Sequence, residues 1–164
     1  MFFYRIKQFF WSLNTKIDDN DTEYVKKNLN AEEYNLFSRL SRQEQRHSIR
    51  VSRDVELECA KTGFAPDEIV KVALLHDIGK TTRKLGSMDK AILVILDRLS
   101  AGRIRNLKDI PKIDVYFNHG NMGYELLKGN DLSERALYLI KNHHDRSITG
   151  DRELDILIRC DSRN

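Results

Sequence analysis

Residues 73–81 read ALLHDIGKT, and this short stretch is the starting point for predicting the architecture. It completes an apolar segment from Ile69 to Leu75 that shows no strand-like alternation and follows Pro66, a residue typical of a first helical turn. The segment therefore predicts a buried helix that delivers the doublet His76-Asp77 at its apolar end. A buried imidazole or carboxylate is costly unless it is paired or coordinated to a cation.

The same helical periodicity extends over nearly the whole chain. Only two prolines occur in 164 residues, and no stretch alternates apolar and polar residues for long. The sequence therefore predicts an all-α protein, a single compact multi-helix bundle. The expected helices, roughly nine in number, cover residues 2–13, 21–29, 31–40, 41–63, 66–79, 87–99, 113–128, 131–144 and 151–161.

Local signals mark several of these helix ends. Two glycines, Gly63 and Gly79, are expected to terminate the helices that precede them. An acceptor side chain followed three residues later by glutamate has the spacing of a capping box. This spacing occurs at Asn30–Glu33, Ser41–Glu44 and Asp131–Glu134.

Size and composition favour one domain with a real core, since 40% of the residues are apolar. We divide the chain into an N-terminal helical extension, residues 1–40, packed on the core, and a main domain, residues 41–164. The extension opens with MFFYRIKQFFW, residues 1–11. We expect its apolar face to pack on the domain or on a second copy, in preference to a membrane surface, which leaves a homodimer possible.

Charge and cysteine usage exclude other classes of protein. The net charge of +3, from 28 basic and 25 acidic residues, is too small to indicate a non-specific nucleic-acid binder, so RNA is possible but not favoured. Cys59 and Cys160 are far apart and are read as buried, reduced thiols. The longest apolar run, Ala91 to Leu96, is too short to span a bilayer, so we predict a cytoplasmic protein without a transmembrane segment.

The five histidines and two of the aspartates fall into one ordered series. Nitrogen and oxygen ligands without cysteine make sites that more often do chemistry than hold a fold together. No histidine is left over: the series reads His47, His76-Asp77, His119, His143-His144 and Asp161.

The series can be arranged around one or two divalent cations, and we favour two. One cation would satisfy four side chains on apolar helices at once, namely His47, His76, Asp77 and Asp161. Asp77 could also bridge to a second cation held by His119, His143 and His144. Such pairs suit phosphoester hydrolysis, because they activate a water and offset charge on the phosphate oxygens. Taken singly, each residue also has a structural explanation, such as a solvated helix end for the double histidine.

Five motifs in this order resemble the HD-domain superfamily of metal-dependent phosphohydrolases over about residues 41–161. They are RHSIRVSRDV around His47, ALLHDIGKT around His76-Asp77, FNHGNMGYELL around His119, LIKNHHD around His143-His144, and LIRCD at Asp161. The resemblance implies an all-α HD-domain bundle with a buried metal site between helices. It implies one metal on His47, His76, Asp77 and Asp161, and a second on Asp77, His119, His143 and His144. In members that share HDIGK the lysine points at the substrate phosphate, which assigns that role to Lys80. Arg83, Lys84 and Arg146 are weaker candidates for substrate binding.

Departures from known subgroups narrow the activity without naming a substrate. Gly79-Lys80-Thr81 replace the Glu-Asp pair of the stringent-response nucleotide hydrolases, and the Gly-Tyr-Pro element of one phosphodiesterase group is absent. We expect a phosphohydrolase or phosphodiesterase that cleaves a phosphate ester or anhydride of a nucleotide or other phosphorylated small molecule. Asp77 and Lys80 would be catalytic, with Mn, Fe, Co, Ni or Mg as the metal. The alternatives are a metal-containing nucleotide sensor or scaffold without turnover, and a structural helical adaptor.

Overall fold

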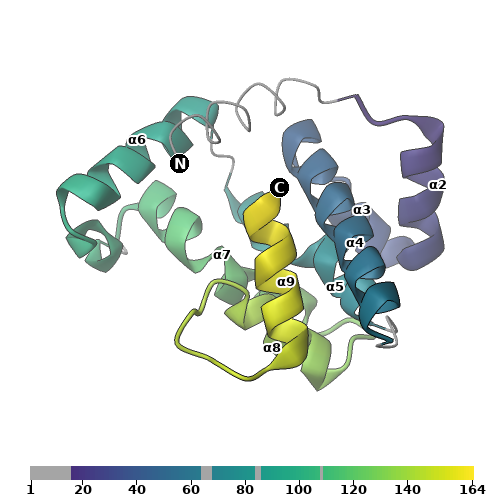
Figure 1. The fold of residues 1–164 in the computed structure, drawn as a ribbon. Helices are drawn as coiled ribbons and strands as arrows, with labels where there is room; N and C mark the ends of the chain where they lie inside the picture. Colours follow the sequence, from purple (N-terminus) through teal and green to yellow (C-terminus); the bar gives the residue numbers. More distant parts are fainter. Residues whose placement is uncertain (1–15, 64–67, 84–85, 108) are drawn as a thin grey trace.

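The computed structural model describes residues 16–63, 68–83, 86–107 and 109–164. These residues form α-helices and two short 3-10 helices, η1 and η2, with no strand among them, so the all-α prediction is confirmed (Figure 1). The predicted helix at residues 2–13 lies outside the described residues. The elements are α2 (Asp19–Asn28), α3 (Ala31–Phe37), α4 (Arg42–Thr62), α5 (Ile69–Leu75), η1 (Ile78–Thr82), α6 (Ser87–Leu99), η2 (Arg103–Asn106), α7 (Pro111–Leu127), α8 (Glu134–Asn142) and α9 (Arg152–Arg163).

Helix α5 lies at the centre of the bundle. All of its residues except Lys71 are buried, and it contacts α2, α3, α4, α8 and α9. A helix that is apolar all round belongs in a core, where each fully buried leucine or valine side chain contributes about 1.5–3 kcal/mol. Because α5 is buried to its last residue, the side chains that follow it are also placed inside the protein.

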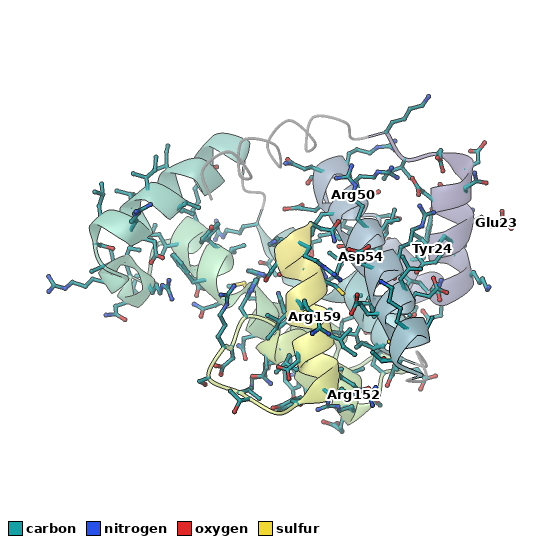
Figure 2. All side chains as sticks on the ribbon, viewed as in Figure 1. Glu23, Tyr24, Arg50, Asp54, Arg152 and Arg159 are labelled. Carbon is teal, nitrogen blue, oxygen red and sulfur yellow. The ribbon has the colours of Figure 1, made fainter. Side chains whose placement is uncertain are left out.

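The long helix α4 and the C-terminal helix α9 lie side by side against this centre (Figure 1). Asp54 on α4 lies beside the end of α9 (Figure 2), where Asn164 donates a hydrogen bond to its carboxylate at 2.9 Å. This pairing brings together residues from the first and last thirds of the chain.

Several predicted helix ends are confirmed. Asn30 with Glu33 and Ser41 with Glu44 form capping boxes, and Gly63 ends α4 in the left-handed conformation at φ +63°. The helix end predicted at Gly79 is wrong. Helix α5 ends at Leu75, and the chain tightens into η1 before it reaches Gly79.

The cap predicted at Asp131 is also wrong. Helix α8 begins at Glu134, and the side chain of Ser133 accepts a hydrogen bond from the backbone N–H of Ala136. The carboxylate of Glu68 accepts a hydrogen bond from the backbone N–H of Ser133 at 3.0 Å, which fixes Ser133 in place. A tertiary contact from the start of α5 therefore selects the cap, and local spacing could not reveal it.

Helices α2 and α3 share the apolar core of the later helices. With the residues that follow each of them, they contribute four buried side chains to the cluster that surrounds α5: Val25, Leu29, Phe37 and Leu40. The start of the functional domain near residue 41 stays a prediction. Within the part of the chain that the structure describes, no helix has the length and apolar character needed to cross a bilayer.

Candidate metal centre

Backbone carbonyls orient three of the histidine rings. His76 and His143 follow the last residues of α5 and α8, and their Nδ1 atoms lie 2.8 Å from the carbonyl oxygen of Ala73 and 2.7 Å from that of Ile140. His119, within α7, places Nδ1 3.1 Å from the carbonyl oxygen of Tyr116. A carbonyl can only accept, so Nδ1 carries the hydrogen, and the neutral ring keeps a free electron pair on Nε2.

All five histidine rings gather in one cluster. Successive ring centroids lie 5.5 Å apart for His47 and His76, 5.0 Å for His76 and His143, and 5.2 Å for His143 and His119. His144 joins the cluster at 4.7 Å from His119. The rings come from α4, the end of α5, α7 and the end of α8, so distant parts of the chain converge on one point.

The carboxylate of Asp77 lies between two groups of imidazoles. Its Oδ2 is 3.9 Å from Nε2 of His47 and 3.7 Å from Nε2 of His76. Its Oδ1 is 3.2 Å from Nε2 of His119 and 3.9 Å from Nε2 of His143. Metal–ligand bonds of about 2.0–2.2 Å place neighbouring ligand atoms roughly 3–4 Å apart, so most of these separations suit shared cations better than direct hydrogen bonds.

Asp161 on α9 completes the first group. Its Oδ1 lies 2.9 Å from Nε2 of His47 and 3.7 Å from Nε2 of His76. Ligand atoms in each of two groups lie within 4.8 Å of one another, and the structure thus brings all seven predicted metal ligands together. The groups are His47, His76 and Asp161, and Asp77, His119, His143 and His144.

Buried atoms without hydrogen-bond partners test whether a cation fits. Among the described residues, six buried side-chain atoms have no hydrogen-bond partner, and three of them are Nε2 of His76, Oδ1 of Asp77 and Nε2 of His143. Such orphaned atoms are uncommon because each carries a desolvation cost. These three belong to this one cluster, where a divalent cation would satisfy them together. The residues present therefore fit a metal centre.

The HD domain family matches residues 45–162, more than two thirds of the chain. The chain belongs to the HD domain family. HD domains form a superfamily of metal-dependent phosphohydrolases, and its members bind divalent metals. No curated protein and no solved structure matches the chain significantly.

Electrostatics hold two histidines of the HD domain's second group, His143 and His144, in the form that binds metals. Burial, together with the neighbouring imidazoles, puts the pKa of His143 well below its ordinary value. Burial and the nearby His119 lower the pKa of His144 to about 4. Although His144 is exposed as a residue, its Nε2 points inward and lies 2.9 Å from Nε2 of His119. Both rings are therefore neutral at pH 7 and available as ligands.

The two aspartates of the HD domain are held ionised. Burial raises the pKa of each, but the charge of Lys80 at Asp77 and the hydrogen bonds from His47 and His76 at Asp161 outweigh burial. Both pKa values therefore lie below the ordinary range. The pKa of His76 is raised, because Asp77 and Asp161 outweigh the effect of its burial. A raised pKa means that His76 holds an additional proton more tightly. A divalent cation would take the place of that proton as the charge partner of the two carboxylates.

Glycines allow the HD domain's segments to approach closely, a role that the sequence analysis missed. A Cβ atom at Gly79 would lie 1.9 Å from the carbonyl oxygen of His119, and one at Gly120 would lie 2.6 Å from the carbonyl oxygen of Lys141. Only residues without a side chain permit η1 and α8 to lie this close to α7. The glycines next to Asp77 and His119 were visible in the sequence, but their partners were not.

Of the predicted substrate-binding residues, the structure brings Lys80 to the centre. Its ammonium nitrogen lies 2.6 Å from Oδ2 of Asp77. Arg83 and Arg146 are exposed, and within the described residues neither forms an ion pair with the clustered aspartates. Lys84 lies outside the described residues.

Proposed function

We propose that this HD domain is an enzyme that hydrolyses a phosphate ester or anhydride of a nucleotide with water activated by divalent metal ions. The observation that carries the proposal is the position of Asp77. Each of its two carboxylate oxygens faces a different pair of imidazoles, with separations of 3.2–3.9 Å. One carboxylate shared in this way is the arrangement that a pair of neighbouring metals requires.

The seven clustered side chains would hold the metals in two overlapping sets. A pair of divalent cations supplies, when bound, an activated water and positive charge beside the phosphate oxygens. The nitrogen and oxygen ligands suit Mn, Fe, Co, Ni or Mg. The first set is His47, His76, Asp77 and Asp161, and the second is Asp77, His119, His143 and His144.

The centre is open to substrate on one side. The side chains of His47, Asp161 and Lys80 keep 25%, 18% and 20% of their surface exposed, whereas His76 and Asp77 keep 0% and 1%. A phosphate group would therefore approach along the side of His47, Asp161 and Lys80. The ammonium group of Lys80 would pair with a phosphate oxygen and stabilise charge that develops there.

The choice of a nucleotide substrate and the domain limits rest on sequence. The HDIGK motif at residues 76–80 resembles that of HD-domain ribonucleases and cyclic-dinucleotide phosphodiesterases, and we carry the nucleotide class over to this chain. We place the start of the catalytic domain at residue 41, with residues 1–40 as its extension. Arg83, Lys84 and Arg146 would contact parts of the substrate beyond the phosphate that is attacked.

Turnover by metal-reconstituted protein tests the proposal. Purified protein is loaded with each metal in turn and offered mononucleotides, dinucleotides, cyclic nucleotides and short RNA, with release of product as the readout. We expect hydrolysis of at least one class, and we expect Asp77→Ala to abolish both turnover and stoichiometric metal while the helical circular dichroism is kept. Asp155→Ala is the matched control, since Asp155 is an exposed aspartate on α9, the helix of Asp161.

Other outcomes identify the alternatives. Tight nucleotide binding without turnover on any member of the panel would establish a sensor or scaffold and overturn the enzyme. Protein that binds no metal at all would establish a helical adaptor.

A further inference from the structure

Helix α6 carries an aliphatic surface that the described structure leaves uncovered. Figure 1 shows α6 at one end of the molecule, away from α4 and α9, and its main contacts are with η2 and α7. Among the side chains that the structure describes, nine large hydrophobic ones are exposed; seven of these lie between residues 92 and 110, and five of the seven are on α6. Single exposed apolar residues are ordinary, but such a concentration on one helix indicates an interaction site.

The inner side of α6 is held firmly against its own chain. Asp89 forms an ion pair with Lys112 at 2.7 Å, and Asp97 forms one with Arg105 at 2.7 Å. Between them, Leu93 is buried in a small cluster with Ile104 and Ile113. Residues 89, 93 and 97 follow one another at helical spacing, so these contacts fix which way α6 faces.

The outer side of α6 presents a continuous stripe. Ile92, Ile95, Leu96 and Leu99 are spaced i, i+3, i+4 and i+7, and their exposed fractions are 49%, 58%, 42% and 79%. Val94, exposed by 37%, lies on another side of the helix. This spacing is the one that two helices bury between them when they pack along a common seam.

We propose that this stripe is a dimer interface, formed by α6 of one copy against α6 of a second copy of the chain. The four stripe residues carry no charge, the two acidic side chains of α6 are paired within their own chain, and the exposed Arg98 borders the stripe, so the stripe itself selects an apolar partner. A stripe of this kind can face itself across a two-fold axis, the commonest symmetry of soluble oligomers.

The exposed area is of the right size for the centre of such an interface. The four aliphatic side chains of the stripe are 42–79% exposed, which gives an apolar area of the order of the ~300–600 Å² of the largest patch on a typical monomer. A standard interface buries about 800 Å² per partner, so polar neighbours of the stripe would supply its rim. The proposal does not depend on catalysis, because none of these residues belongs to the metal centre.

Matched charge substitutions on the full chain test the proposal by sedimentation equilibrium. We expect a concentration-dependent dimer that Ile95→Glu converts to a monomer, with a dissociation constant at least about 100-fold weaker, equivalent to ~2.7 kcal/mol. Leu57→Glu is the control, since Leu57 on α4 is exposed by 57%, almost as much as Ile95. It should leave the dimer intact. A chain that is monomeric at every concentration, or a dimer that Ile95→Glu does not weaken, overturns the proposal.

A cysteine cross-link tests the same contact without adding charge. The two natural cysteines are fully buried, so a cysteine introduced on the surface has no reactive competitor. Under mild oxidation Ile95→Cys should form an intermolecular disulfide, and Leu57→Cys should not. If the chain is a monomer and Ile95→Glu alone lowers its melting temperature, residues 1–15 cover the stripe instead. If the chain binds phosphatidylcholine vesicles through the stripe, a lipid surface is what covers the stripe. Either result overturns the dimer.

Discussion

The ammonium nitrogen of Lys80 lies 2.6 Å from Oδ2 of Asp77, the carboxylate that faces both groups of imidazoles. Asp77 outweighs burial and raises the pKa of Lys80, so the ammonium stays charged. It therefore competes with a metal for one oxygen, and substrate phosphate would give it a new partner.

This competition predicts opposite effects of Lys80→Gln on metal binding and on catalysis. Removing the ammonium should leave Mn²⁺ affinity unchanged or tighter, measured by isothermal titration calorimetry. Hydrolysis should fall by about 10²-fold, because the phosphate loses a charge partner in the transition state. Lys61→Gln, at an exposed position of α4, should change neither quantity. A variant that lost its metal together with its activity would show that Lys80 acts only by shaping the site.

The pKa values predict how the stability of the metal-free protein depends on pH. His144 stays neutral in the folded protein down to about pH 4, and the pKa of His143 is also lowered. In the unfolded chain both take up a proton near pH 6.5, so proton uptake favours unfolding as the pH falls below that value. The melting temperature in chelator should therefore fall between pH 6.5 and pH 4.

Two comparisons separate this contribution from others. His144→Gln should reduce the fall in melting temperature between pH 6.5 and pH 4. The lowered pKa values of Asp77 and Asp161 act in the same direction, but only near and below the ordinary aspartate pKa of about 3.9. His76 acts above pH 6.5: its pKa is raised, so the stability it contributes is lost as the pH rises through that raised value. A melting temperature that did not change between pH 6.5 and pH 4 would contradict neutral, buried rings.

Gly79→Ala should damage both the fold and the metal centre. The new methyl group would lie 1.9 Å from the carbonyl oxygen of His119, so α7 must move and carry its imidazole away from Asp77. Overpacking of this kind costs about 1–3 kcal/mol or more, measured by urea unfolding. Gly129→Ala is the control, because a Cβ there has nothing within 4 Å and the backbone conformation suits alanine. Equal stability of the two variants would refute this close contact.

Asp21→Asn tests whether α2 belongs to the same cooperative unit as the metal centre. Asp21 is 1% exposed and pairs with Arg46 and Arg53, and Arg46 immediately precedes the proposed ligand His47. We expect the free energy of unfolding to fall by about 2–3 kcal/mol, with a single transition in urea. Breaking a fully buried pair costs ~3–5 kcal/mol, and the cost here is smaller because Arg53 is 42% exposed. Asp19→Asn is the control, because it leaves Asp21 and its two arginine partners in place. It should lower the free energy of unfolding by less than ~1 kcal/mol. Two separate transitions would show that α2 folds independently.

The sequence predicted which histidines and aspartates the structure brings together, because their positions relative to apolar helices are visible without tertiary contacts. A histidine or aspartate at the end of an apolar helix is conspicuous, and His76-Asp77 after α5 needed no knowledge of tertiary contacts. Ser133 could not be chosen over Asp131 in this way, because the selecting contact comes from Glu68, distant in sequence. The sequence also did not show which apolar residues of α6 are exposed. Ile92 and Ile95 resemble core residues in sequence, and only the packed fold shows that Leu93 turns inward while these two stay exposed.

Three imidazoles of the centre are aimed by main-chain oxygens: His76 by Ala73, His119 by Tyr116 and His143 by Ile140. Because every residue type supplies the same oxygen, the aim of each ring depends on where the backbone runs and not on which side chain stands at these three positions. Ala73 and Ile140 are fully buried, so the packing of the core holds two of these oxygens in place. A substitution that left the backbone unmoved would therefore leave the rings in place as well.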